Sequence, residues 1–165
     1  MLTTLAPPDL ADSLPWTTPG VLVGVDGSTH SVTALSYANQ LARTLGLPLH
    51  AVLAWDYPPP LYQDLAYPQV RTSVRAHAGE RLRDAIDAVL DGDEPPWLTY
   101  DARQGAPAAT LLALSRYARL LVVGTRGHGG FADLLLGSVS ATCVSHAPCP
   151  VVVVPRTWRV ESETS

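Results

Sequence analysis

Short, mostly apolar runs alternate along this chain with longer segments in which apolar residues recur every three or four positions. The runs are rich in valine and leucine and cover residues 21–25, 49–55, 120–124 and 150–154, with a weaker one at 97–102. A strand that is covered on both faces needs apolar side chains on both sides, so these runs predict interior strands of a sheet.

The intervening segments have the 3.6-residue period of helices. We expect helices at residues 31–45, at 70–90, from 105–107 onward, and at 137–146. Ser28 and Thr29 supply N-cap residues before the first helix, and Gly46 stands where that helix should end. Pro107 suits a first helical turn.

Strands that alternate with helices pair in parallel, because each crossover helix returns the chain to the same end of the sheet. The pattern therefore predicts one α/β domain, a doubly wound five-stranded parallel sheet with helices on both faces. We expect this domain at residues 20–155. A proline-rich, flexible arm at 1–19 would precede it, with Trp16 as a docking candidate, and a polar tail at 156–165 would follow.

The charged residues narrow the function classes. The chain has 165 residues, of which 11 are basic and 15 acidic, and every basic residue is an arginine. The absence of lysine excludes a P-loop lysine and a Schiff-base lysine. An acidic balance with scattered arginines also argues against nucleic-acid binding.

Other features of composition point to a soluble, cytoplasmic protein. The apolar runs are far shorter than the roughly 20 residues of a membrane-spanning helix, and we find no signal-peptide pattern at the start. Cys143 and Cys149 match no zinc spacing and are expected to be small buried side chains. No metal-ligand set is expected.

Two turn segments follow strands on the same edge of the predicted sheet. One is Asp26-Gly27-Ser28, and the other is the glycine-rich loop that starts at Gly124 and leads to Gly137-Ser138 at a helix start. Ligands of open parallel sheets bind beyond the carboxyl ends of the strands, where the strand order reverses. These two segments are therefore the candidate site.

The glycine-rich loop has the chemistry of a phosphate site. Glycines bring backbone N–H groups close to an anion, and the N-terminus of the following helix adds unpaired N–H groups. Ser138 could donate a hydrogen bond to phosphate, and Arg126 could neutralise charge. The alternative is a flexible loop with helix-capping residues, but glycines at both ends of the segment favour phosphate binding.

Residues 20–155, which contain both of these turn segments, resemble the universal stress protein family. The resemblance runs from Val-Gly-Val-Asp-Gly-Ser at 23–28 to Pro-Cys-Pro-Val-Val-Val-Val-Pro at 148–155. Nucleotide-binding members carry a glycine, two residues, a second glycine, nine residues, a third glycine and then Ser or Thr. Here these positions are Gly124, Gly127, Gly137 and Ser138. The resemblance implies a Rossmann-like fold of the adenine nucleotide alpha hydrolase type.

The resemblance also implies roles for individual positions. Asp26 would bond the ribose or the polar edge of the nucleotide, Ala54 would bond adenine through its backbone, and a Mg²⁺ ion would be held mainly by the phosphates of ATP. The full set of expected binding residues is Gly24, Val25, Asp26, Ala54, Val123, Gly124, Arg126, Gly127, His128, Gly137, Ser138, Val139 and Ser140.

Several of these interpretations have plain structural alternatives. Asp26 could only cap the first helix, and the tyrosines of the segment 56–69 could either line an adenine pocket or pack on the next helix. The remaining histidines, His30, His50, His77 and His146, have no metal-ligand spacing and are expected to be structural. The arginines and acids of the second helix are expected to form a solvated face.

The last strand, Val151–Val154, should lie at a sheet edge, and a bare edge of four valines invites association. The resemblance implies a homodimer through this strand, whereas the alternative is that the C-terminal tail covers it.

We therefore expect an ATP-binding stress-response sensor or signalling dimer. No residue is placed as a general base, so we expect no dedicated turnover, although slow hydrolysis stays open. One alternative is an adenylating enzyme, whose Ser-Gly-Gly-x-Asp-Ser loop is missing here. Another is a dimeric adaptor that binds no nucleotide.

Overall fold

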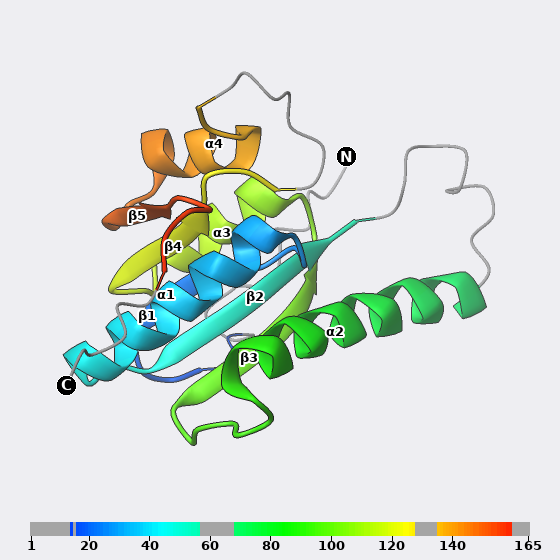
Figure 1. Ribbon diagram of the computed structural model, residues 1–165. Helices are drawn as coiled ribbons and strands as arrows, with labels where there is room; N and C mark the ends of the chain where they lie inside the picture. The colour runs from blue at the N-terminus through cyan, green and yellow to red at the C-terminus, as the bar shows by residue number, and fades with distance from the viewer. Residues whose placement is uncertain (1–13, 15, 57–67, 128–134, 160–165) are drawn as a thin grey trace.

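The sheet of this protein has five parallel strands in the order β3-β2-β1-β4-β5. The structure, a computed structural model, describes residues 14, 16–56, 68–127 and 135–159 (Figure 1). Its elements are β1 (Val21–Gly24), α1 (Thr29–Leu45), β2 (Leu49–Trp55), α2 (Pro68–Leu90), β3 (Leu98–Gln104), α3 (Pro107–Ser115), β4 (Leu120–Gly124), α4 (Ser138–His146) and β5 (Val151–Val154). The predicted α/β fold and its five strands are confirmed.

Helices cover both faces of the sheet, as the apolar strands require. Helices α1 and α2 pack on one face and α3 and α4 on the other (Figure 1). Alternate residues of β1 serve the two layers, since Val21 and Val23 belong to the cluster under α1 and α2, whereas Leu22 belongs to the cluster under α3. All three valine and leucine side chains are fully buried.

The strand order reverses at β1. From β1 the chain first moves outward through β2 to β3, and it then crosses back to place β4 on the other side of β1. The register pairs Val21 with Leu49 on one side and with Leu120 on the other. The carboxyl ends of β1 and β4 are thus neighbours, which is where a crevice forms in such a sheet.

Local signals fix the first helix at both ends. The Ser28 hydroxyl accepts a hydrogen bond from the amide of Ser31 at 3.2 Å, which caps α1 as expected. Gly46 ends the helix with φ 63°, a left-handed conformation that glycine adopts without steric cost.

Other boundaries differ from the sequence-based ranges by a few residues. Helix α2 begins at Pro68 instead of residue 70, and β3 extends to Gln104. Helix α3 ends at Ser115. Frayed helix ends carry weak periodic signals, because few of their side chains are buried.

The segment before β1 is tied to the domain at Trp16. Its indole is 7% exposed and stacks on His50, with ring centroids 4.3 Å apart. His50 Nε2 donates to the carbonyl oxygen of Thr18 at 2.9 Å, and its Nδ1 lies 2.6 Å from the Thr99 hydroxyl. Trp16, the docking candidate of the sequence, therefore packs on the domain, while residues 1–13 and 15 lie outside the described part.

The segment after β5 also packs on the domain. The Trp158 indole meets the Tyr37 ring of α1 edge to face, with centroids 5.1 Å apart, and joins the cluster under α1 and α2. The expected tail at 156–165 therefore begins with a packed turn, while residues 160–165 lie outside the described part.

The two cysteines behave as the sequence predicts. Cys143 is fully buried and Cys149 partly so, and both are free thiols. Burial, with a smaller effect from Cys149, raises the pKa of the Cys143 thiol to about 11.

In the described part of the chain, no helix combines the length and apolar character needed to cross a membrane.

His50 makes the stability of the protein depend on pH. Burial lowers the pKa of His50 below the ordinary 6.5, although the hydrogen bond to Thr18 acts in the opposite direction. Below pH 6.5 the unfolded chain then binds more protons than the folded one. The stability that a neutral His50 contributes is complete above pH 6.5 and is lost as the pH falls from there.

We expect His50→Gln to lower the free energy of unfolding more at pH 7.5 than at pH 5. Chemical denaturation of both proteins at the two pH values measures this difference, and the other histidines cancel because both proteins contain them. An equal cost at both pH values would contradict the assignment.

Candidate functional site

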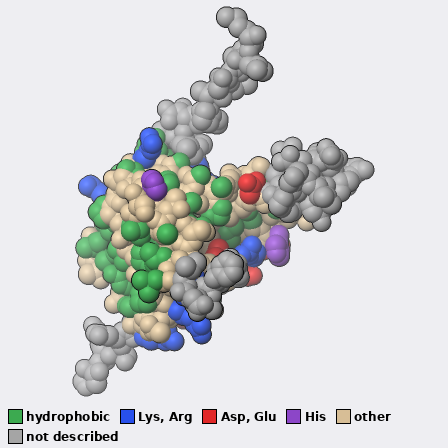
Figure 2. Space-filling view, turned by 90° about the horizontal axis from the view of Figure 1, so that it is seen from above, with side chains coloured by type: hydrophobic (Ala, Val, Ile, Leu, Met, Phe, Trp, Pro, Cys, Tyr) green, Lys and Arg blue, Asp and Glu red, His purple; other side chains and the backbone are tan. Residues whose placement is uncertain are grey.

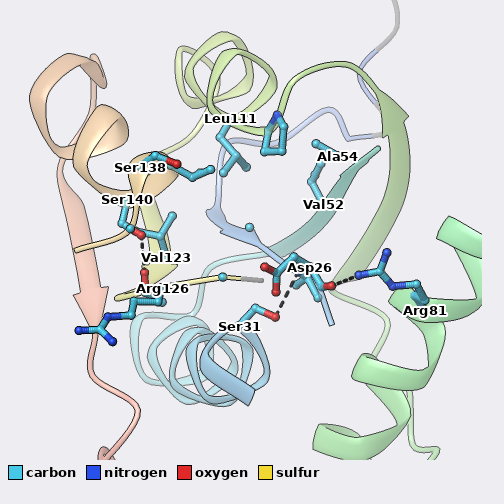
Figure 3. Close-up of a pocket in the computed structure, with 17 residues that line it drawn as sticks. Asp26, Ser31, Val52, Ala54, Arg81, Leu111, Val123, Arg126, Ser138 and Ser140 are labelled. Carbon is cyan, nitrogen blue, oxygen red and sulfur yellow. Dashed lines mark hydrogen bonds between the residues drawn. The ribbon is translucent and has the colours of Figure 1, made fainter. Parts of the chain in front are cut away.

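A cavity of about 330 Å³ opens at the carboxyl ends of β1, β2 and β4 (Figure 3). This volume is in the range of small-molecule sites. It is lined by Gly24, Val25, Asp26, Ser31, Val52, Ala54, Arg81, Pro107, Leu111, Val123, Gly124, Arg126, Gly127, Gly137, Ser138, Val139 and Ser140. The lining residues come from both sides of the point at which the strand order of the sheet reverses, as expected for a ligand site in such a sheet.

Asp26 follows β1 and is held by its own turn. Its amide donates to the Ser31 hydroxyl at 3.2 Å, and its Oδ1 accepts from the Ser28 amide at 2.9 Å. The carbonyl oxygen of Asp26 accepts from Nη2 of Arg81 on α2. In Figure 3 the Asp26 carboxylate points toward the middle of the cavity, whereas its carbonyl oxygen points toward Arg81.

Gly127, at the described start of the glycine-rich loop, lies directly against Asp26. The amide of Gly137 donates to the carbonyl oxygen of Thr125 at 2.7 Å, which closes the two ends of the loop on each other. A Cβ on Gly127 would overlap Oδ2 of Asp26, and one on Gly137 would lie 3.3 Å from the Cα of Arg126. Glycine at both positions is thus what permits the close approach.

Helix α4 presents its N-terminus to the cavity. Gly137 is its N-cap and provides no side-chain hydrogen bond, while the residues of the first turn, 138–140, line the cavity. The first amides of a helix have no partner within the helix, and the helix dipole makes this end positive. The buried Ser140 hydroxyl donates to the carbonyl oxygen of Gly124 at 2.6 Å, which ties the first turn of α4 to the end of β4.

The remaining wall of the cavity is apolar. Val52 and Ala54 of β2 and Leu111 of α3 lie together on one side (Figure 3). Gly24 makes room for α3, since a Cβ there would lie 2.7 Å from Cδ1 of Leu111. The cavity thus has an apolar part beside β2 and a polar part between Asp26 and α4, a combination suited to a ligand with an aromatic ring and an anionic tail.

Every expected binding residue that the structure describes lines this cavity, and His128 lies outside the described part. The Arg126 side chain does not enter it, because Figure 3 shows its guanidinium pointing away. Whether these residues bind a ligand stays a prediction.

Sequence reasoning missed five lining residues, which are Ser31, Val52, Arg81, Pro107 and Leu111. Val52 and Leu111 carry only a core signal, and Ser31 looks like an ordinary helix residue. Arg81 was assigned to a solvated helix face, whereas it is half-buried and bonds Asp26. Only the three-dimensional packing of α2 identifies it.

On the face shown in Figure 2, basic side chains are scattered and form no continuous patch. Among residues 14, 16–56, 68–127 and 135–159, no three His, Cys, Asp or Glu side chains come close enough together to hold a metal ion.

Comparison with known proteins agrees with this architecture. The model of the universal stress protein family matches residues 20–155. A universal stress protein of Thermus aquaticus is 34% identical over 136 residues, which cover 81% of this chain and 96% of that protein. One of Mycolicibacterium smegmatis is 36% identical over 140 residues, but the chain spans only 45% of its length.

A solved structure of a universal stress protein in complex with cAMP is also similar, with 26% identity and a TM-score of 0.53. The match covers 86% of this chain and all of that one. With a family match over most of its length and a relative of similar size above 30% identity, this chain belongs to the universal stress protein family.

Proposed function

We propose that this protein binds ATP in the cavity between Asp26 and α4 and acts as a nucleotide-dependent sensor or signalling dimer in the stress response. The observation that carries the proposal is that Gly127 and Gly137, the N-terminus of α4 and the Asp26 carboxylate meet in one cavity. The known structure with cAMP supports an adenine nucleotide as the ligand class.

The phosphates would lie between Gly127 and the N-terminus of α4. Backbone N–H groups at Gly127 and at residues 138–140 would donate to the phosphate oxygens, and the Ser138 hydroxyl is exposed for the same purpose. This arrangement needs no lysine, in agreement with the composition.

The nucleoside would occupy the other half of the cavity. The Asp26 carboxylate suits ribose hydroxyls, because an ionised carboxylate accepts strong hydrogen bonds from them. The apolar surface of Val52, Ala54 and Leu111 suits the faces of an adenine ring, and the backbone of Ala54 would bond its edge.

Mg²⁺ would neutralise the phosphates and be held mainly by their oxygens and water. The lining residues offer one carboxylate, Asp26, whose Oδ1 already accepts a hydrogen bond from the Ser28 amide. Among the described residues that line the cavity, Asp26 is the one acid and there is no histidine that could activate water. We therefore propose binding without dedicated turnover.

We further propose a homodimer through the β5 edge. In the described part of the sheet β5 pairs only with β4, and the side chains of Val151, Val152 and Val153 are only partly buried. Val144 on the neighbouring α4 is 50% exposed. Pairing two such edges across a two-fold axis would satisfy the free backbone groups and cover these valines.

The first test replaces Gly127 with glutamate. We expect wild-type protein to bind ATP·Mg²⁺ in isothermal titration calorimetry and Gly127→Glu to lose binding, since its side chain displaces Asp26 and brings a carboxylate to the phosphate position. Gly79→Glu, which adds the same charge at an open position on α2, is the matched control. Wild-type protein that binds no adenine nucleotide would refute the proposal and leave the adaptor alternative.

Asp26→Ala should weaken ATP binding by about 1–3 kcal/mol, because a charge-assisted hydrogen bond is lost. Asp26→Asn separates the two possible roles of the residue, since its amide oxygen can still accept from the Ser28 amide while the charge is gone. If Asp26 only shapes its turn, Asp26→Asn will bind ATP as the wild type does.

Val153→Pro should convert the dimer to a monomer without unfolding it. The carbonyl oxygens of residues 150 and 154 accept from β4, so strand alternation directs the N–H of Val153 to the free edge, where proline removes it. Native mass spectrometry should give about twice 17.6 kDa for the wild type and for Val153→Thr, the control that keeps the N–H, and 17.6 kDa for Val153→Pro. A monomeric wild type would end the dimer proposal.

A further inference from the structure

Arg81 is held at the cavity by a firmly packed part of α2. Its helical neighbours Ala78, Leu82, Ala85 and Ile86 are almost fully buried against the sheet. Arg81 itself is half-buried and projects from this helix toward the turn after β1 (Figure 3). Core packing therefore fixes the helical turn from which the Arg81 side chain extends.

The guanidinium lies over the turn that carries Asp26. Its Nη2 donates to the carbonyl oxygen of Asp26, and both Nε and Nη2 lie 3.5 Å from the point where a Cβ of Gly27 would be. Gly27 has φ +82°, a conformation that favours glycine. Glycine allows the peptide unit between residues 26 and 27 more orientations than another residue would, and the Arg81 bond holds its oxygen.

Two further hydrogen bonds of Asp26 are local. They come from Ser28 and Ser31 at the start of α1, two and five residues away, whereas Arg81 is 55 residues away. These local bonds hold the amide and the carboxylate. The Arg81 bond holds the carbonyl oxygen, which is turned outward, while the carboxylate is turned into the cavity (Figure 3).

Building on the proposed nucleotide binding, we infer that Arg81 is the positioning residue of the nucleoside end of the cavity. It acts through Asp26, by holding the carboxylate in the orientation that meets the ribose. Because it acts on the nucleoside end, its contribution is the same for adenosine as for ATP.

The alternative role for Arg81 is a direct contact with the phosphates. Arg81 would then supply positive charge inside the cavity, into which the Arg126 guanidinium does not point. A phosphate contact contributes nothing to adenosine binding, so comparing the two ligands separates the roles. The location of Arg81 beside Asp26, and its existing bond to a backbone carbonyl, favour the positioning role.

The experiment measures the dissociation constants of adenosine and of ATP for wild type, Arg81→Ala, Arg81→Lys and Arg83→Ala. Arg83 lies on the same helix, is exposed and does not line the cavity, so its variant controls for the loss of one positive charge. We expect Arg81→Ala to weaken both ligands by the same factor, about ten-fold, which is the value of one charge-assisted hydrogen bond. Arg81→Lys should recover part of this loss, and Arg83→Ala should match the wild type.

A double-mutant cycle with Asp26→Ala tests the route of the effect. If Arg81 acts through Asp26, removing Arg81 from the Asp26→Ala protein should change adenosine affinity by less than about two-fold. Thermal unfolding of each variant without ligand checks that the fold is kept, and Arg81→Lys serves in place of Arg81→Ala if the latter does not fold.

Three results would overturn the inference. They are a loss confined to ATP, an Arg81→Ala protein that binds adenosine as Arg83→Ala does, and a full ten-fold loss on the Asp26→Ala background. A wild type that binds neither ligand is a separate result, because it removes the proposed function itself.

Discussion

The contact between the end of β4 and the first turn of α1 determines the geometry of the whole site. A Cβ on Gly124 would lie 2.8 Å from the carbonyl oxygen of His30, so only glycine allows the strand to end this close to the helix. The His30 ring then reaches the Thr125 hydroxyl at 3.0 Å. Since Asp26 precedes α1 and Gly127 follows β4, this contact adds to the strand order in bringing the two halves of the cavity together.

Without lysine, the positive potential of the cavity comes from the backbone and from arginine. The N-terminus of α4 and the glycine amides provide it at one end, and Arg81 provides it beside Asp26. Backbone donors are fixed by the fold and do not lose side-chain entropy when they bind an anion. A site built in this way depends more on backbone shape than on the identity of individual side chains, which explains why glycines dominate the sequence pattern.

The sequence predicted the fold well because local signals and topology agree. The apolar strands, the cap at Ser28 and the glycine at 46 each follow from neighbouring residues, and the parallel order then places the carboxyl ends of β1 and β4 together. The role of Arg81 could not be predicted in this way, because α2 carries several arginines and no local feature indicates which of them reaches the cavity. The direction of the Arg126 side chain and the stacking of Trp16 on His50 also depend on contacts distant in sequence.

Trp16 and Trp158 close opposite layers of the molecule. Trp16 belongs to the cluster that also holds Leu111 and Leu114 of α3, while Trp158 joins the cluster under α1 and α2. One indole comes from the segment that leads into the sheet and the other from the segment that leaves it. On each face of the sheet, one tryptophan from outside the strands and helices therefore completes the hydrophobic cluster. Removing the segment with either tryptophan would expose the cluster on one face and leave the cluster on the other face covered.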